Sequence, residues 1–441
     1  NFHQNESQLC PDGSNRWPDE FESRDLLETL HQMGGTVTRS FGLSVQIPGE
    51  PDAHLWGPGQ YSEDGFAAHD RALAIAAELG IRLIFPFIDS HSFPNVRGID
   101  EFSAWRGKKG IEFWTDPQLK DDFRQLIHDV LNRRNTVNGR LYKEDPTILA
   151  WQLGNELDSY FPDRGMGWEE GLNALTPWSL EMAAFLKSED SDHLVMEAGG
   201  HRNAYFDDPS IDILSDHYYE YWNKLFGKPY ALAPIHLESM EKIAGRKPLI
   251  VDEFGLAEME NLERLMDAII TSGCSGGLLW SVRSHRRDGG FYCHNEGGTN
   301  VNSYHWPGFR SADAWNEADV LHLLRSKAFE IQGLPLSPLP APTGQPILLT
   351  VAEGRLFWRG CTGASGYRVE RKTPGGVWTT LAEGVSDSNI TDVPAYEESG
   401  SVEVPPFYTD PAPLPGAEYR IVGVNQSGET PTSNVVTLRE P

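Results

Sequence analysis

Two glutamates each follow an apolar run of strand length. Glu156 comes at the end of Ala-Trp-Gln-Leu-Gly-Asn-Glu, which begins at Ala150, and Glu253 comes at the end of Leu-Ile-Val-Asp-Glu, which begins at Leu249. Cleavage of a glycosidic bond uses one carboxylic acid to protonate the leaving oxygen and a second carboxylate to attack the anomeric carbon; in retaining enzymes the two lie about 5 Å apart. The two glutamates therefore indicate a retaining glycosidase, provided that the fold brings both to one face.

Parallel strands joined by crossing helices meet this condition, because all the strands then end at one rim. The sequence alternates helix and strand in this way, and its apolar runs are continuous, as is typical of strands buried on both faces. We expect strands at residues 36–41, 81–88, 147–153, 193–197, 211–218, 248–253 and 276–280, and helices at 21–33, 64–79, 117–133 and 177–187. Seven strands are one short of a closed (β/α)8 TIM barrel, and residues 1–3 could be the exit of the first strand.

Composition restricts the partners. The chain has 441 residues, 37 Lys and Arg against 64 Asp and Glu, and a net charge of −27. Nothing resembles the basic patch that a nucleic acid requires, whereas a neutral polysaccharide is compatible with this charge. No apolar run approaches the roughly 18 residues of a membrane span, and the start lacks a signal-peptide pattern. We expect a monomer that is secreted or extracytoplasmic, with any export signal already removed.

The sequence favours chemistry without a metal or cofactor. The four cysteines lie far apart and show no CxxC pair, so zinc and thiol-redox chemistry are not expected. The polar segment 281–309 is too long for a simple connection, and we expect it to be a functional loop over the cleft. Its His285, Asp288, His294 and His305 lack the spacing of metal ligands.

The C-terminal quarter is a different kind of chain. Residues 333–346 are a proline-rich linker, and short strands separated by Gly, Pro and Asp turns follow. Residues 342–440 resemble a fibronectin type III domain, in Trp358, in Gly366-Tyr-Arg-Val369 and in Tyr419-Arg-Ile-Val422. We expect a barrel domain over residues 1–335, and a linker with a small all-β immunoglobulin-like sandwich, without chemistry, over 336–441.

Residues 1–335 resemble glycoside hydrolase family 5, of the clan whose barrels carry the two glutamates on strands four and seven. The resemblance is most specific in Phe113-Trp-Thr-Asp-Pro117, in the stretch 134–151 and in Asn155-Glu156, and it is similar to the β-mannanase branch. It implies that Glu156 is the acid/base and Glu253 the nucleophile. The surrounding site that it implies consists of Asn155, Arg39, His217, Tyr219 and Trp280.

The chemistry of these positions can also be argued from the residues. Glu156 must be protonated, and we expect burial and a second carboxylate to raise its pKa. Glu253 must stay ionised, and hydrogen bonds from Arg39 and Tyr219 would favour its charged form.

The remaining positions suit a sugar. Asn155 can bind the sugar 2-hydroxyl, and Trp280 offers an apolar face to a pyranose ring. His217 is the expected partner of the acid/base, and His91, after the strand 81–88, is a further candidate.

Aromatic side chains that follow strands are candidates for sugar stacking, because sugars present flat apolar faces. Some of them are expected to be core residues. They are Trp105, Trp114 and Trp222, together with Tyr160, Trp168 and Trp306.

We expect an endo-acting β-1,4-mannanase that binds β-mannan poly- or oligosaccharides. One departure leaves an exo-acting β-mannosidase open: endo-mannanases commonly have Pro-Arg after the acid/base, whereas Leu157 and Asp158 follow here. A β-glucanase of the same clan also stays open, as does a glycan-binding protein with an inactive barrel. The presence of both glutamates argues against the binding protein, since an inactive site is free to lose them.

Overall fold

The chain folds into two compact units. In this computed structural model the described residues are 8–9, 15–47, 53–93, 96–225, 227–292, 304–308, 317–388 and 406–439. Unit 1 consists mainly of Thr36–Trp280, and unit 2 joins Asp19–Gly35 to Ser281–Pro441. The division thus follows Trp280, whereas the sequence predicted a domain boundary at residue 335, which stays a prediction.

Unit 1 contains seven parallel strands in the order of the sequence. β3, β6, β9 and β10 pair as neighbours, β11, β12 and β13 form a second run, and a bridge between Met196 and Ile213 links the two. The strands are β3 (Val37–Arg39), β6 (Arg82–Pro86), β9 (Ile148–Gln152), β10 (Leu194–Met196), β11 (Leu214–Tyr219), β12 (Leu249–Gly255) and β13 (Gly276–Leu279). These are the seven predicted strands. Their described pairings run from β3 to β13 without closing a barrel, and residues 1–3 lie outside the described part of the chain.

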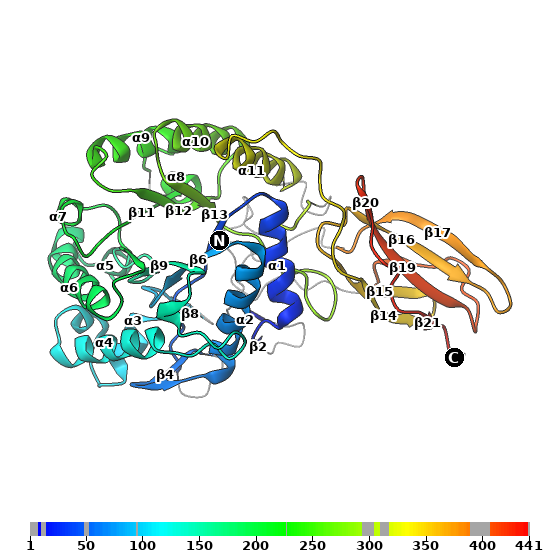
Figure 1. The fold of residues 1–441 in the computed structure, drawn as a ribbon, viewed down its shortest axis with the longest axis horizontal. Coiled ribbons are helices and arrows are strands. Elements are labelled where there is room, and N and C mark those ends of the chain that lie inside the picture. Colours follow the sequence, from blue (N-terminus) through cyan, green and yellow to red (C-terminus); the bar gives the residue numbers. More distant parts are fainter. Residues whose placement is uncertain are drawn as a thin grey trace. The chain divides into compact units, whose positions relative to one another are not determined.

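Helices connect these strands and lie on their outer side (Figure 1). The predicted helices at 64–79, 117–133 and 177–187 are confirmed as α2, α4 and part of α6. The helices of unit 1 are α2 (Glu63–Leu79), α3 (Ile99–Ala104), α4 (Pro117–Leu131), α5 (Tyr160–Asp163), α6 (Trp168–Glu189), α7 (Asn203–Phe206), α8 (Glu220–Leu225), α9 (Leu232–Ile243) and α10 (Met259–Thr271). None of the described helices is both long and apolar enough to span a bilayer.

Local sequence explains where these helices begin and end. The Ser62 side chain accepts a hydrogen bond from Gly65 N at the start of α2, and Gly80 ends that helix in a left-handed conformation (φ +71°). Asp116 caps α4 in the same way, and Pro117 occupies its first turn.

The interior of unit 1 is a cluster of aliphatic side chains. Ile84, Ala150, Met196, Ile213 and Ile250 pack together, each from a different strand or from the residue just before one. Such packing holds neighbouring strands at fixed heights, so the polar residues that follow these positions reach the carboxyl-terminal rim together.

Unit 2 combines helices with antiparallel strands. It contains α1 (Glu20–Gln32) and α11 (Glu317–Ile331), and one sheet of β14, β15 and β18 with another of β16, β17, β19, β20 and β21. The strands are β14 (Ile347–Ala352), β15 (Arg355–Arg359), β16 (Gly366–Lys372), β17 (Trp378–Val385), β18 (Tyr408–Thr409), β19 (Glu418–Asn425), β20 (Gly428–Glu429) and β21 (Val436–Thr437). The buried side chains of Trp358, Tyr367 and Tyr419 belong to one core cluster that both sheets share.

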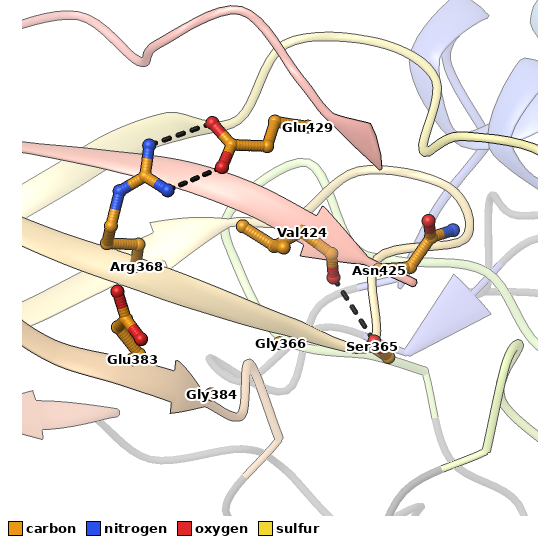
Figure 2. A pocket seen from close by; sticks show the side chains of 8 residues that line it. All are labelled: Ser365, Gly366, Arg368, Glu383, Gly384, Val424, Asn425 and Glu429. Atoms are coloured by element: carbon orange, nitrogen blue, oxygen red, sulfur yellow. Dashed lines mark hydrogen bonds and ion pairs between the residues drawn. The ribbon is translucent and has the colours of Figure 1, made fainter. Parts of the chain in front are cut away.

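A pocket of about 350 Å³ lies on this β-rich part (Figure 2). Arg368 donates two hydrogen bonds to Glu429 at its edge, and Ser365 Oγ donates to Val424 O at 3.2 Å. None of its eight lining residues is aromatic. Of its charged groups, Arg368 and Glu429 are paired with each other.

Candidate active site

The two predicted catalytic glutamates meet at the rim of unit 1. Carboxylate oxygens of Glu156 and Glu253 and a ring nitrogen of His217 all lie within 4.8 Å of one another. Glu253 is within β12 and its side chain is 4% exposed, whereas Glu156 follows β9 and its side chain is 24% exposed. This separation is that of the carboxylate pair of a retaining glycosidase, which lies closer than an inverting pair because no water has to fit between.

Backbone geometry brings Glu156 to this position. At Gly154, a Cβ would lie 2.6 Å from Ile88 O, so only glycine lets the chain pass here. Asn155 N donates to that same oxygen at 2.7 Å. Glu156 itself has φ +46°, a left-handed conformation that costs a non-glycine residue about 1–3 kcal/mol. The surrounding structure therefore holds the carboxylate in place against local strain.

Arg39, at the end of β3, joins the strands of the rim. Its side chain is fully buried, and its three guanidinium nitrogens each donate one hydrogen bond: Nε to Gln152 at 2.6 Å, Nη1 to Glu253 at 2.8 Å and Nη2 to Asn155 at 2.6 Å. Nε also lies 3.2 Å from Asp252 Oδ2. The planar guanidinium thus fixes the nucleophile candidate and the Asn155 amide at once.

The remaining partners of Glu253 come from β11. A register shift between Asp216 and His217 sets His217 opposite Glu253. Tyr219, two residues after His217, donates a hydrogen bond from its hydroxyl group to Glu253 Oε2. Trp280 follows β13, and its ring packs 5.0 Å from the ring of Phe41.

Two histidines hold Glu156. His217 Nδ1 lies 2.7 Å from Glu156 Oε1, and His91 Nε2 lies 3.2 Å from Oε2. Asp89 Oδ1 lies 2.8 Å from His91 Nδ1 and so orients the His91 ring. Asp89 Oδ2 accepts a hydrogen bond from Asn155 Nδ2 at 2.8 Å. The structure thus brings both His91 and His217 to the acid/base candidate.

The pKa directions differ from the expectation for these glutamates. Burial acts to raise the pKa of Glu156, but the hydrogen bond and charge of His217, with the charges of His91 and Arg39, outweigh it and lower the pKa to about 2. Burial raises the pKa of Glu253, and the charges of His217 and Arg39 only partly offset this. Both histidines have raised pKa values, His91 to about 10, because burial is outweighed by the neighbouring carboxylates. The predicted raised pKa of Glu156 was wrong, because the spacing of residues in the sequence does not show that two cationic histidines lie beside this carboxylate.

Three rim residues were not predicted. Gln152, Asp89 and Asp252 are fully buried, and Gln152 Nε2 donates to Asp252 at 2.8 Å. Asp252 also lies 3.4 Å from His217 Nε2. Two of them could have been noticed as polar residues inside apolar runs, since Asp252 precedes Glu253 and Gln152 ends β9. The sequence alone does not show which groups such residues bind.

A cation could be coordinated by Glu156, His217 and Glu253, which are close enough to ligate one. Their partners favour another role. Arg39 donates directly to Glu253, and a guanidinium beside a carboxylate repels a metal ion. The hydrogen-bond donors Arg39 and Tyr219 are suited to a carboxylate pair that transfers a proton and reacts with a sugar.

The predicted aromatic residues have different environments. Trp114 is buried in a cluster with ring centroids 5.4 Å from Phe161 and 5.2 Å from Trp178, so its assignment as a substrate-binding residue was wrong: it is a core residue. Tyr160 and Trp306 are likewise buried. Trp105 is half-buried with its ring centroid 4.7 Å from Phe102, and Trp222 (36%) and Trp168 (47%) are exposed. Stacking of sugars on Trp105 and Trp222 stays a prediction.

The segment after β13 was predicted to be a loop over the cleft, which stays a prediction. Its described residues belong to unit 2 and are largely buried there. His285 lies 3.0 Å from both Asp25 and Asp387, and His305 Nδ1 lies 2.8 Å from Glu317. Asp288 pairs with Arg286, and His294 lies outside the described residues. These histidines and carboxylates stabilise unit 2, which explains the polarity of the segment.

Comparisons with known proteins agree with this geometry. Residues 86–268 match the sequence family described as GH family 5 beta-mannosidase-like. The chain is 29% identical over 322 residues to mannan endo-1,4-beta-mannosidase 1 of Arabidopsis thaliana, across 59% of this chain and 75% of that protein. It is 37% identical over 172 residues to mannan endo-1,4-beta-mannosidase 7 of the same plant, across 38% of this chain and only 37% of that protein.

Solved structures show the same fold. The endo-beta-1,4-mannanase from Thermotoga petrophila superimposes with a TM-score of 0.56 at 17% identity, across 100% of this chain and 96% of that one. The glycoside hydrolase family 5 mannosidase from Rhizomucor miehei gives a TM-score of 0.56 at 18% identity, across 75% and 99%. The segment 86–268, which carries both Glu156 and Glu253, therefore resembles the beta-mannosidase-like branch of glycoside hydrolase family 5, on the fold of the solved mannanases.

Proposed function

We propose that this protein is a retaining glycoside hydrolase that cleaves β-1,4-mannosidic bonds inside mannan-type polysaccharides. The observation that carries the proposal is the pair of carboxylates within 4.8 Å, with Arg39 and Tyr219 on Glu253 and two histidines on Glu156. The substrate class is supported by relatives that are mannan endo-1,4-beta-mannosidases.

The geometry accounts for a double displacement. Glu253 attacks the anomeric carbon while Glu156 protonates the leaving oxygen, and water then hydrolyses the glycosyl ester as Glu156 accepts its proton. Arg39 and Tyr219 keep Glu253 oriented, and Asn155, fixed between Arg39 and Asp89, presents its amide to the sugar. His217 contacts Glu156 and has a raised pKa, so it keeps its own proton and orients the Glu156 carboxyl group through this contact.

Three finer features are part of the proposal. We infer that the seven strands belong to a (β/α)8 barrel, because the alternation and the rim site are those of that fold. The strands β14–β21, with their shared core, support a fibronectin type III-like domain. A polymeric substrate supports action outside the cytoplasm, as a secreted protein.

The experiment is a product time course on mannohexaose beside cellohexaose. Early release of mid-length manno-oligosaccharides is the expected result. Mannose released one unit at a time would replace the endo assignment by the exo-acting one, and turnover of only the cello series would overturn the mannan assignment.

Variants test the chemistry. Glu253→Gln should abolish turnover while leaving substrate binding measurable. Glu260→Gln, which changes a side chain 75% exposed on α10, is the matched control and should keep full activity. Full activity in Glu253→Gln would contradict the assigned nucleophile.

A further inference from the structure

A charged cluster lies directly beyond Glu156. Asp158 follows the acid/base candidate by two residues, and the turn that follows β10 packs against it. Leu157 N donates to Ala198 O at 2.8 Å, and a Cβ on Gly199 would lie 3.2 Å from Asp158 Cβ. Arg202 Nη2, from the same turn, lies 3.5 Å from Asp158 Oδ2. Two separate connections thus place a carboxylate and a guanidinium side by side.

Buried groups hold this turn in place. Glu197 is fully buried and accepts hydrogen bonds from Gly199 N at 2.6 Å and from Ser215 N at 2.7 Å. Gly200 follows in a left-handed conformation (φ +73°), which favours glycine. Arg202 also donates to Gly199 O. The position of the guanidinium is therefore set before any ligand arrives.

The cluster keeps hydrogen-bonding capacity for a ligand. Arg202 Nε is buried and has no hydrogen-bond partner among the described residues, and the side chain is 14% exposed. The Asp158 side chain is 18% exposed. Burial raises the pKa of Asp158 to about 6, although the charge of Arg202 opposes this. A buried donor without a partner costs free energy, which a hydroxyl group of a bound sugar would recover.

The position of the cluster identifies which sugar it meets. Asp158 follows β9 and Arg202 follows β10, which are neighbouring strands, whereas Glu253 lies in β12 and Arg39 in β3. The acid/base protonates the oxygen of the leaving group, so residues beyond it on the side away from the nucleophile face the leaving sugar. We propose that Asp158 and Arg202 form a binding subsite for the leaving-group sugar, in which the guanidinium and the carboxylate hold its hydroxyl groups.

This inference rests on the proposed function and assigns a specificity role to residues of two different connections. Asp158 follows the acid/base candidate along the chain, and Arg202 supplies a guanidinium from the next connection. Bound acceptor sugars should use the same subsite, because a retaining enzyme can transfer its glycosyl group to a sugar in place of water.

The test compares two leaving groups in the full-length protein. Mannopentaose has a sugar leaving group, and nitrophenyl β-mannobioside has an aryl leaving group without sugar hydroxyls. Arg202→Ala should lower kcat/KM for mannopentaose about 10- to 100-fold, the usual effect of losing a charge-assisted hydrogen bond, and leave the aryl substrate unchanged. It should also reduce transglycosylation relative to hydrolysis. Arg202→Lys should recover part of the kcat/KM for mannopentaose and part of the transglycosylation.

Controls separate the outcomes. Arg124→Ala removes a partly buried, ion-paired arginine of α4 and should change neither substrate. Equal losses on both substrates in Arg202→Ala, or an unchanged transglycosylation ratio, would overturn the subsite. If the unmodified protein cleaves neither mannoside, the proposed function fails instead. Asp158→Asn keeps the side-chain shape and should give a smaller loss confined to mannopentaose; an equal loss on the aryl substrate would remove Asp158 from the subsite.

Discussion

Replacement of Arg39 is the most informative single perturbation of the site. Its guanidinium is fully buried and donates to Gln152, Asn155 and Glu253, and it also lies 3.2 Å from Asp252. Arg39→Ala would leave two buried carboxylates without this cation and the Asn155 amide oxygen without this donor. The loss of stability comes mainly from the buried carboxylate charges left without a partner, and less from the hydrogen bonds that are lost.

The structure gives the size of the effect. Removal of one partner from a buried ion pair costs about 3–5 kcal/mol. For a folded unit of this size each kcal/mol lowers Tm by about 2–4 °C, so we expect Tm to fall by about 6–20 °C. Loss of one preorganised charge in an active site lowers kcat by at least about a hundredfold. The pKa of Glu253 should rise further, because Arg39 is one of the cations that now lower it.

Arg39→Lys distinguishes charge from geometry. Lysine keeps the charge but cannot reach three acceptors in one plane, so stability should be largely retained while kcat/KM falls. The assays are thermal unfolding by circular dichroism and kcat/KM on mannopentaose across pH. Arg133→Lys is the matched control, because Arg133 pairs with the buried Asp70 at 2.8 Å outside the rim; it should leave both kcat/KM and the pH profile unchanged. Wild-type kcat/KM and an unchanged pH profile in Arg39→Lys would refute the assigned role.

Two further predictions concern histidines. His217→Asn removes the largest influence that lowers the pKa of Glu156, so the limb of the pH profile set by Glu156 should move up from about pH 2 towards 4.5 or higher; an unmoved limb would remove His217 from that role. In unit 2, burial lowers the pKa of His285 but Asp25 and Asp387 raise it to about 9, above its ordinary 6.5. Its stabilising contribution should therefore be complete below pH 6.5 and lost as pH rises through 9, as urea unfolding from pH 6 to 10 would show. His285→Gln should flatten that dependence, and an equal decline in both proteins would contradict the assignment.

The sequence predicted the parts of the fold that follow from local pattern. The seven parallel strands of unit 1 and the helices α2 and α4 lie where apolar runs and amphipathic segments placed them. Both glutamates reach one rim because strand ends in a parallel sheet share an edge, an argument that needs only the order of elements. Arg39 and Tyr219 were correctly expected beside Glu253 for the same reason.

Other features depend on distances that pattern does not contain. Trp114 follows a strand, yet its loop folds back and buries the ring against Trp178 of a later helix. The segment after β13 is polar because its histidines pair with buried carboxylates such as Asp25 and Glu317, from parts of the chain that sequence order separates. The pKa of Glu156 depends on two imidazoles within 3.2 Å, and no spacing in the sequence reports such a contact.

The electrostatics of the rim predict an effect of substrate binding on the two glutamates. Productive chemistry needs Glu156 protonated and Glu253 ionised, whereas the neighbouring cations lower the pKa of Glu156 and burial raises the pKa of Glu253. A sugar can correct this, because the Glu156 side chain is still 24% exposed and loses its water on binding, while that of Glu253 is already only 4% exposed. Desolvation of a carboxyl group raises its pKa, so binding should raise the pKa of Glu156 more than that of Glu253.

The two pH profiles of one enzyme measure this difference. The profile of kcat/KM reports pKa values of the free protein, and that of kcat reports those of the substrate complex. We expect the limb set by Glu156 to lie at higher pH in kcat than in kcat/KM, and the limb set by Glu253 to move less. Because the two carboxyl groups are coupled, Glu156→Gln identifies the limb that belongs to Glu156 by removing it. Identical profiles would mean that the sugar leaves the charge of Glu156 undisturbed.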